Sequence, residues 1–564
     1  MLERATSSGL NKLYFCSVKN DRRWKQAVVL FFKGEKCIIS YITSKFKQMA
    51  DKEKFLETVE SGYTFKSDSF KLGGAMLDGA VVPGADVKIP FKTLNRHGLI
   101  AGATGTGKTK TLQIIAECLS DAGIPVLMMD IKGDLSGIAA AGTSNEKIAE
   151  RSQKLNIEFT PKAYPTELLT LSQEKGTRLR ATVSEFGPVL LSKILGLNDT
   201  QGGIVSVIFK YCDDNKYPLL DLKDFIKVLQ YIGDEGKDAI EKMYGKISTA
   251  STGTILRKVI ELQQQGADLF FGEKSFEVND LMRKTDDGKG MVSIVRVTDL
   301  QDRPKLFSTF MLQLLAELYG SSPEEGDLDK PKLVMFIDEA HLIFQEASDV
   351  LLEQIETIVK LIRSKGIGIY FCTQNPMDVP APVLSQLGLK IQHALRAFTA
   401  ADRKVIQKTA ENYPISTFYK TDELLTKLGI GEAIISVLNE KGIPTPLVHC
   451  MLRAPQSRMD ILSPAEIDTL VSQSKIAAMY NQVVDNKSAY EILNDKLAVA
   501  EERAAQQAEE EKAEKDAGKT SNQKKKGFFD DPIVKSMTRT AGNSIVRTLL
   551  GVLGLGGRSR KRLF

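Results

Sequence analysis

The residues from Gly102 to Thr109, which read G-A-T-G-T-G-K-T, have the types and spacing of a phosphate-binding loop. Glycines let the backbone close around phosphates, so that amide N–H groups and the N-terminus of a following helix face the negative charge. Lys108 is expected to reach the β- and γ-phosphates, and Thr109 to bind Mg²⁺. The alternative is an ordinary glycine turn before a helix. The residues assigned to nucleotide binding are Gly102, Ala103, Thr104, Gly105, Thr106, Gly107, Lys108, Thr109 and Lys110.

Two carboxylates at the end of an apolar run form a second candidate for nucleotide chemistry. Residues 332–337 have the pattern of a buried strand, and Asp338 and Glu339 follow it directly. Asp338 is expected to hold Mg²⁺ together with Thr109. Glu339 is expected to polarise the water that attacks the γ-phosphate, because hydrolysis needs a base within reach of that water. The alternative is a strand end that carries two solvated charges. For His341, which follows closely, a structural role is preferred over contact with the site.

Polar residues at two further strand ends are candidates for the same site. Thr373 and Gln374 end the run 366–374, and Gln374 is expected to sense a γ-phosphate or to orient a water molecule. Asp130 ends another apolar run, and Asp130 or Lys132 is expected to position Mg²⁺ or phosphate through a neighbour, unless this segment is a solvated turn. Ligands of open α/β sheets lie at the carboxyl edge of the strands, where these residues would meet.

A mostly parallel sheet is needed to bring these residues together, and the chain has the pattern of an α/β fold. Short apolar runs alternate with amphipathic stretches across the regions that carry the motifs. The predicted strands are 97–101, 124–130, 291–297, 332–337, 366–374, 389–395, 431–437 and 446–451, and the last is expected to close the sheet. The predicted helices between them are 111–119, 305–319, 344–363 and 402–409.

The chain is too long for one hydrophobic core, and its pattern divides into five parts. In order they are a poorly defined extension with two candidate strands (1–48), a small β element (49–90), a nucleotide-binding core (91–140 and 286–455) interrupted by an inserted, mostly helical subdomain (141–285), and a helical, charged region with a Gly-rich basic tail (456–564). The predicted helices of the insertion are 182–195, 203–213, 222–232 and 254–265. The insertion is either a lid or a partner-binding module.

The composition is that of a globular protein and excludes few functions. The net charge of +5 over 564 residues is small, so that a nucleic-acid surface would have to be local. Six scattered cysteines form no C-x-x-C pair, which favours a reducing compartment without structural zinc. The sequence contains no run of 18 apolar residues, and we expect a cytoplasmic protein. The apolar stretch 544–557 is expected either to contact a membrane surface or anionic partner, or to pack against the body or another subunit.

Several of these segments together are similar to a known family. The segments 95–109, 130–135 and 336–341 resemble the HerA/FtsK branch of P-loop ATPases. Residues 393–398, residues 452–459 and the Gly-rich basic end are similar to a narrower group, the HerA-like C-terminal-domain (YjgR-like) proteins. The resemblance covers residues 52–564.

This resemblance implies a P-loop NTPase core of the additional-strand, RecA-like type that uses ATP and Mg²⁺. It also implies a homo-oligomeric ring, often a hexamer, in which one subunit supplies an arginine to the γ-phosphate bound by its neighbour. Arg363 and Arg396 are the two candidates for this arginine, and the alternative for each is a surface ion pair. DNA as the track of such a ring follows from the resemblance alone.

Three functions are compatible with these residues. The first is a Mg²⁺-dependent ATPase motor of the HerA/FtsK type that translocates or remodels DNA. The second is an ATP-driven switch or assembly factor that acts on protein or membrane partners without DNA. The third, a phosphoryl transferase, is disfavoured because Glu339 and Gln374 suit attack by water better than attack by a bound acceptor. Stimulation of hydrolysis by nucleic acid would separate the first two functions.

Overall fold

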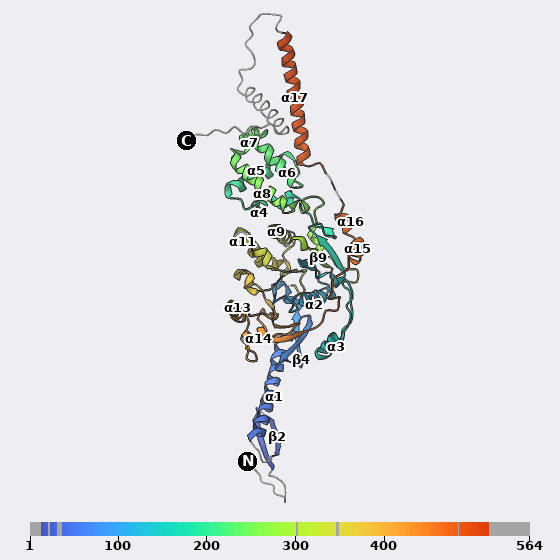
Figure 1. Ribbon diagram of the computed structural model, residues 1–564, viewed down its shortest axis with the longest axis vertical. Helices are drawn as coiled ribbons and strands as arrows, with labels where there is room; N and C mark the ends of the chain where they lie inside the picture. The colour runs from blue at the N-terminus through green and yellow to red at the C-terminus, as the bar shows by residue number, and fades with distance from the viewer. Residues whose placement is uncertain are drawn as a thin grey trace, which may run out of the picture. The chain divides into compact units, whose positions relative to one another are not determined.

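The computed structural model describes residues 13–20, 23–30, 36–300, 303–326, 328–345, 349–482, 484 and 486–517 (Figure 1). The chain divides into two compact units, residues 1–492 and residues 493–564. The helix α17 (Ala489–Ala517) begins in the first unit, and its remainder is the described part of the second. The site residues predicted above all belong to the first unit.

A twelve-stranded sheet forms the centre of the first unit, with the strand order β4-β3-β14-β13-β12-β5-β11-β10-β6-β9-β7-β8. The strands from β12 to β8 run parallel, and β13, β14, β3 and β4 pair in antiparallel fashion. Their bounds are β3 Ser69–Leu77, β4 Ala80–Pro90, β5 Gly98–Ala101, β6 Val126–Asp130, β7 Thr166–Thr170, β8 Thr177–Arg178, β9 Val292–Arg296, β10 Leu333–Ile337, β11 Ile367–Thr373, β12 Leu389–Gln392, β13 Glu432–Ser436 and β14 Val448–Leu452. A separate antiparallel pair is formed by β1 (Leu13–Asn20) and β2 (Arg23–Leu30).

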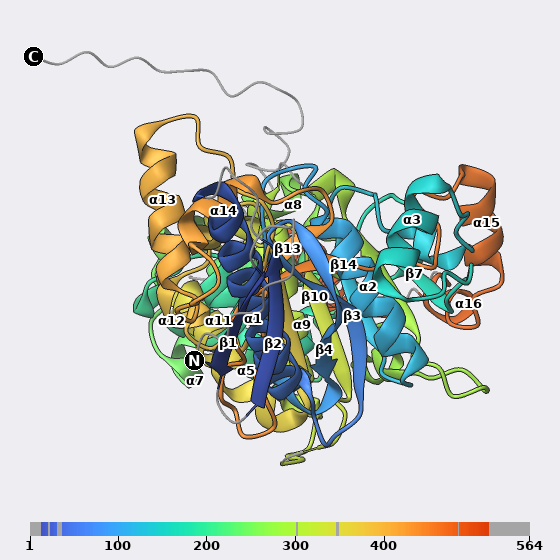
Figure 2. The same ribbon diagram turned by 90° about the horizontal axis from the view of Figure 1, so that it is seen from below.

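Both faces of the parallel part are covered by helices. One face carries α2 (Lys108–Asp121), and the other carries α9 (Pro304–Ser321) and α11 (Asp349–Ile362) (Figure 2). Successive residues of a strand point to opposite faces, and every residue of β6, β10 and β11 is buried. Burial on both faces is the reason that these strands appear in the sequence as continuous apolar runs.

The eight strands predicted from the sequence are all present, but the sheet does not close where it was predicted to close. Strands β3 and β4 of the segment 49–90 continue the sheet beyond β14, because β14 pairs with β3 and β3 pairs with β4. At Gly73 a side chain would collide with the carbonyl group of Met451, so glycine permits this pairing. Helix α1 (Lys36–Tyr63) covers this part, and its buried Tyr63 donates to the carbonyl oxygens of Ile435 and Pro446. Within the segment 49–90, the two strands therefore belong to the main sheet, and residues 49–63 belong to helix α1.

The region 141–285 contains the predicted helices and also two strands that the sequence pattern did not indicate. Strands β7 and β8 extend the main sheet beyond β9, and a continuous helical region starts only at Thr182, which caps α4. The predicted helix 344–363 is described as α10 and α11, with residues 346–348 outside the described part. The remaining helices are α3 Glu146–Leu155, α4 Val183–Ile194, α5 Asp199–Asn215, α6 Leu222–Gly233, α7 Lys237–Tyr244, α8 Thr249–Gln264, α10 His341–Gln345, α12 Ala381–Leu384, α13 Ala400–Glu411, α14 Thr421–Lys427, α15 Pro464–Ser472 and α16 Ala477–Tyr480.

Within the described ranges, no helix combines the length and the apolar character that crossing a membrane would require. The apolar stretch 544–557 and the basic tail lie outside the described residues.

Candidate nucleotide-binding site

Four neighbouring parallel strands bring the predicted site residues to one edge of the sheet. Strand β11 lies between β5, which precedes the glycine loop, and β10, which precedes Asp338; β6 lies on the other side of β10. Because the four strands are parallel, their carboxyl ends meet at the same edge. Strand β11, which lies between β5 and β10, is the additional strand of the predicted RecA-like fold. The structure thus gathers residues that are more than 270 positions apart in the sequence.

The glycine loop is anchored to the strand ends on both sides of β5. The Gly102 N–H donates to the Thr373 carbonyl at 3.2 Å, and the Ala103 N–H donates to the Ala394 carbonyl at 2.8 Å. Gly102 has φ +152°, and a Cβ at this position would lie 2.5 Å from the Cβ of His393, so no other residue fits here. The loop tip at Gly105 is exposed, and an added Cβ there would meet nothing within 4 Å. The loop therefore has a fixed base and an open tip.

The side chains at the start of α2 are arranged around this loop. The Lys108 ammonium is buried and donates to the carbonyl oxygens of Gly102 at 2.7 Å and Ala103 at 3.4 Å. Burial lowers the pKa of Lys108, and the nearby Lys132 charge lowers it further. The Lys110 side chain points elsewhere, because its Nζ donates to the Met459 carbonyl at 2.5 Å. The side chain of Lys110, which we had assigned to nucleotide binding, is therefore engaged with residues after the sheet.

Two carboxylates, those of Asp134 and Asp338, are candidates to share a metal ion with Thr109. The Thr109 hydroxyl donates to Oδ2 of Asp134 at 3.2 Å. Asp338 is 3% exposed, and burial raises its pKa to about 6, with the charges of Glu339 and Asp134 acting in the same direction. Oδ2 of Asp338 and Oδ1 of Asp134 are buried without a hydrogen-bond partner. A hydroxyl and two carboxylates, each with one buried oxygen that has no hydrogen-bond partner, are oxygen ligands of the kind that Mg²⁺ prefers.

The loop after β6 is held in shape by Asp130. Its carboxylate accepts the backbone N–H groups of Gly133 at 2.7 Å, Asp134 at 3.1 Å and Leu135 at 3.2 Å. Burial raises the pKa of Asp130 to about 7, and the charge of Asp134 contributes to the shift. Asp130 itself is turned into the loop, and its neighbours Lys132 and Asp134 face the site. That Asp130 or Lys132 positions Mg²⁺ or phosphate through a neighbour stays a prediction.

Glu339 is surrounded by polar partners from three strand ends. Lys132 Nζ forms an ion pair with Oε1 of Glu339, and Gln374 Nε2 donates to the same oxygen at 3.4 Å. His341 Nδ1 lies 3.2 Å from the other oxygen, Oε2. Burial is the largest single effect and opposes the charged form of Glu339, but the hydrogen bonds and charges of Lys132, Gln374 and His341 together outweigh it, so the pKa is lowered. His341, for which we preferred a structural role, therefore contacts a predicted site residue.

The remaining predicted residues do not take part in this cluster. The Thr373 hydroxyl donates to Asp378 at 2.9 Å. Arg363 is exposed and precedes β11, so it lies at the edge of the sheet opposite the glycine loop. There its charge helps to lower the pKa of His97. Arg396 is exposed and follows β12 on the same edge as the loop. Neither a role for Asp134 nor the pairing of Lys132 with Glu339 was predicted. Lys132 and Asp134 nevertheless lie in the segment 130–135, which the sequence analysis identified.

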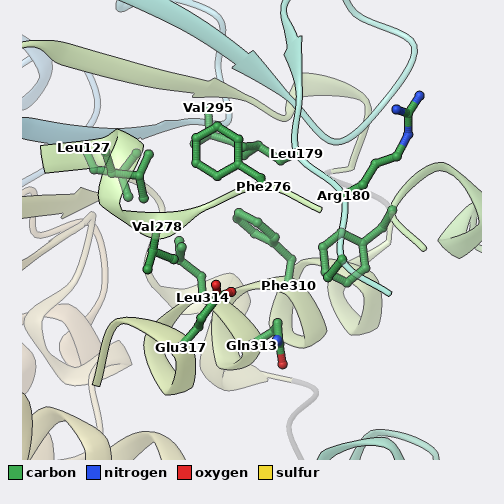
Figure 3. A pocket seen from close by; sticks show the side chains of 13 residues that line it. Leu127, Leu179, Arg180, Phe276, Val278, Val295, Phe310, Gln313, Leu314 and Glu317 are labelled. Carbon is green, nitrogen blue, oxygen red and sulfur yellow. The ribbon is translucent and has the colours of Figure 1, made fainter. Parts of the chain in front are cut away.

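A separate cavity of about 30 Å³ lies between the sheet, α9 and the segment before α4 (Figure 3). Its walls are mostly apolar, with Leu127, Val295, Phe276 and Phe310 among the side chains that Figure 3 shows. Burial raises the pKa of Glu317 at this cavity to about 7. The volume is enough for a water molecule and far too small for a nucleotide, so this cavity is not the nucleotide site.

The chain is similar to several known proteins. The bacterial conjugative coupling protein TrwB aligns with 72% of this chain and 94% of its own chain, at a TM-score of 0.46 and 12% identity. The DNA double-strand break repair helicase HerA of Sulfolobus acidocaldarius is 23% identical over 385 residues, which cover 67% of this chain and 70% of that protein. The protein with the same description from Saccharolobus solfataricus is 24% identical over 355 residues, 62% of this chain and 63% of its own.

The sequence pattern of one protein family matches most of the chain. This family is described as helicase HerA-like C-terminal, and its match extends over residues 77–561. The match includes the glycine loop, the Asp338–Glu339 pair and every strand of the parallel part of the sheet. The chain therefore belongs to the helicase HerA-like C-terminal family.

Proposed function

We propose that this protein is a Mg²⁺-dependent ATP hydrolase of the HerA/FtsK type that works as a DNA motor. The observation that carries the hydrolase assignment is the cluster at the carboxyl edge of β5, β11, β10 and β6. It combines a glycine loop with an open tip, the Lys108 ammonium, and the carboxylates of Asp338 and Glu339. Each part supplies one of the functions that phosphoryl transfer to water needs: binding of phosphate, compensation of its charge, and a base.

The metal-binding residues fit this proposal. Thr109 and Asp338 would hold Mg²⁺, and Asp134 lies next to Thr109. The free oxygens of Asp338 and Asp134 are the supporting observation, because a buried carboxylate oxygen without a partner is costly unless a ligand satisfies it. No group of three or more His, Cys, Asp and Glu side chains suited to a metal exists among the described residues. This agrees with Mg²⁺, which uses one or two protein carboxylates and takes its other ligands from phosphates and water. Bound Mg²⁺ would neutralise charge on the β- and γ-phosphates.

The other side chains of the cluster then take defined parts in hydrolysis. Lys108 would exchange the carbonyl oxygens of its own loop for phosphate oxygens. Glu339 would accept the proton of the attacking water, and Gln374, which already contacts Glu339, would orient that water. The site is at the edge of the sheet, and the exposed loop tip at Thr104 and Gly105 leaves it accessible to the nucleotide.

A ring of identical subunits would complete this site with an arginine. Arg363 is separated from the loop of its own subunit by the seven residues of β11, or roughly 20 Å at the rise of a strand, so it can act only on a neighbouring subunit. Arg396 is the second candidate and lies on the same edge as the glycine loop. Both side chains are exposed, and neither forms an ion pair with another described residue. DNA as the substrate is supported by family membership and by the relatives described as DNA double-strand break repair helicases.

The experiment that tests this proposal is ATP hydrolysis by the purified protein with and without single- and double-stranded DNA. Glu339→Gln serves as the control for hydrolysis at this site, and it should lower kcat by about 100-fold or more. Hydrolysis that Glu339→Gln abolishes and DNA raises several-fold is the expected result. Hydrolysis that depends on Glu339 but ignores DNA would favour an ATPase that acts on protein or membrane partners. No hydrolysis in any condition would refute the role of Glu339.

A mixing experiment tests the arginine. Arg363→Ala and Lys108→Ala should each be inactive alone, and a mixture of the two should regain activity, because some sites then combine an intact loop with an intact arginine from the neighbour. Lys360→Ala removes an exposed positive charge one turn earlier and should leave hydrolysis unchanged. A mixture that stays inactive, while Arg396→Ala and Lys108→Ala complement each other, would assign this role to Arg396.

A further inference from the structure

Lys132 is the one cation that contacts the proposed catalytic base among the residues that the structure describes, and the hydrolytic mechanism above does not use it. Its ammonium forms an ion pair with Oε1 of Glu339, and the side chain of Lys132 is 34% exposed whereas that of Glu339 is 6% exposed. The charges of Asp338 and Asp134 also act on Lys132, and Lys132 in turn acts on Lys108. Lys132 therefore contacts the proposed base, is close enough to the phosphate-binding lysine to affect its charge, and is the more exposed member of the ion pair.

The loop that carries Lys132 is held in shape by hydrogen bonds within the loop itself. The three backbone N–H groups that Asp130 accepts define its path, and Gly133, with φ +76°, supplies the left-handed turn directly after Lys132. Glu339 also has a left-handed backbone, with φ +45°, which is a costly conformation for a glutamate. Two rigid backbone segments thus hold the ammonium and the carboxylate against each other.

The contacts of Glu339 restrict one of its two carboxylate oxygens. One carboxylate oxygen is taken by Lys132 and Gln374, and the other lies beside His341. The ion pair holds Oε1 against the Lys132 ammonium, whereas Oε2 is buried without a hydrogen-bond partner. For Oε1 to accept a proton from water, Glu339 has to lose its contact with Lys132.

We propose that Lys132 is a γ-phosphate sensor that restrains Glu339 until ATP is bound. This inference rests on the proposed ATPase function. A γ-phosphate brings additional negative oxygens to the edge of the sheet where Lys132 lies, and these compete with Glu339 for the ammonium. Transfer of Lys132 from Glu339 to the γ-phosphate frees the carboxylate and adds a positive charge to the phosphate that is attacked. ADP, which lacks this phosphate, leaves the ion pair of Lys132 and Glu339 closed.

Equilibrium binding of ADP and of a non-hydrolysable ATP analogue, each with Mg²⁺, tests this assignment in the full-length protein. Lys132→Met should weaken binding of the ATP analogue about tenfold and change the affinity for ADP less than twofold. In hydrolysis assays of the same variant, kcat should fall and KM for ATP should rise. Lys132→Arg should restore most of the preference for the analogue, because it keeps the charge. Lys175→Met is the matched control. Lys175 lies in the loop after β7, on the same edge of the sheet, and pairs with Asp468. Its removal should leave the affinities for ADP and for the ATP analogue unchanged.

A double-variant cycle separates sensing from a merely structural role. Glu339→Gln removes the partner that competes for Lys132, so this variant should bind the ATP analogue several-fold more tightly than the wild type, with ADP affinity unchanged. The gain should vanish in the double variant Lys132→Met/Glu339→Gln. A Lys132→Met protein that still prefers the analogue as the wild type does would refute the sensor, while leaving the ATPase proposal intact. Binding of neither nucleotide by the wild type would refute the proposed function itself.

Discussion

Protonation of His97 should destabilise the sheet next to the glycine loop. His97 precedes β5, is 2% exposed, and joins three elements. Its Nδ1 accepts the Ile369 N–H of β11 at 3.0 Å, and its Nε2–H donates to the Val359 carbonyl of α11 at 2.8 Å. This arrangement satisfies only the neutral ring, because a second ring proton would point at the Ile369 N–H. Burial lowers the pKa of His97 from 6.5 to about 4, and the Arg363 charge contributes to the shift.

The sign and the size of the effect follow from this pKa. Between pH 6.5 and pH 4, His97 is protonated in the unfolded chain but not in the folded chain. The contribution of neutral His97 to the free energy of unfolding is therefore fully present above pH 6.5 and is lost as the pH falls. The contribution of His97 lost at pH 5.5 is about 1.4 kcal/mol, and the full loss below pH 4 is about 3 kcal/mol. Buried His393, with a pKa also lowered to about 4 by burial, should contribute a similar amount.

The assay is urea unfolding followed by circular dichroism at pH 7.5 and pH 5.5, for the wild type and His97→Gln. Glutamine keeps one donor and one acceptor but does not titrate. When the pH falls from 7.5 to 5.5, the free energy of unfolding should therefore decrease by about 1.4 kcal/mol less in His97→Gln than in the wild type. His393→Gln should behave in the same way, and the two effects should add if the sites are independent. An unchanged pH dependence in His97→Gln, with an unchanged m-value, would refute the assignment of His97 as a neutral, buried hydrogen-bonding link.

Two further perturbations test the site and the packing behind it. Asp338→Asn should raise the Mg²⁺ concentration needed for half-maximal ATP hydrolysis at least about tenfold, because it removes a charged metal ligand, and an unchanged Mg²⁺ requirement in a metal titration would contradict this role. Gly98→Ala should cost about 1–3 kcal/mol of stability in urea unfolding, because the added Cβ would lie 2.5 Å from Cε1 of buried Tyr370. Gly203→Ala in helix α5 is the matched control, since its Cβ would meet nothing within 4 Å, and equal stability losses in the two variants would argue against the Tyr370 clash.

Much of the nucleotide site was predictable because its parts are short and contiguous in the chain. The glycine loop carries its own turn residues, its lysine and its threonine within eight positions. The strands β5, β6, β10 and β11 were predictable because burial on both faces requires apolar residues throughout. The polar residues at their ends were also identified, since the carboxyl edge of a parallel sheet is where ligands bind.

The tertiary structure alone decided which strands are neighbours and which side chains meet. Local patterns predicted strands in the core but did not show that β3 and β4 extend the sheet at one side and β7 and β8 at the other. Strand order depends on pairing between distant segments, and no local spacing encodes it. The contact of Lys132 with Glu339 is of the same kind, because it joins residues from two loops more than 200 positions apart. The sequence by itself determined the chemistry of the nucleotide-binding residues, and packing of the parallel strands decided their partners.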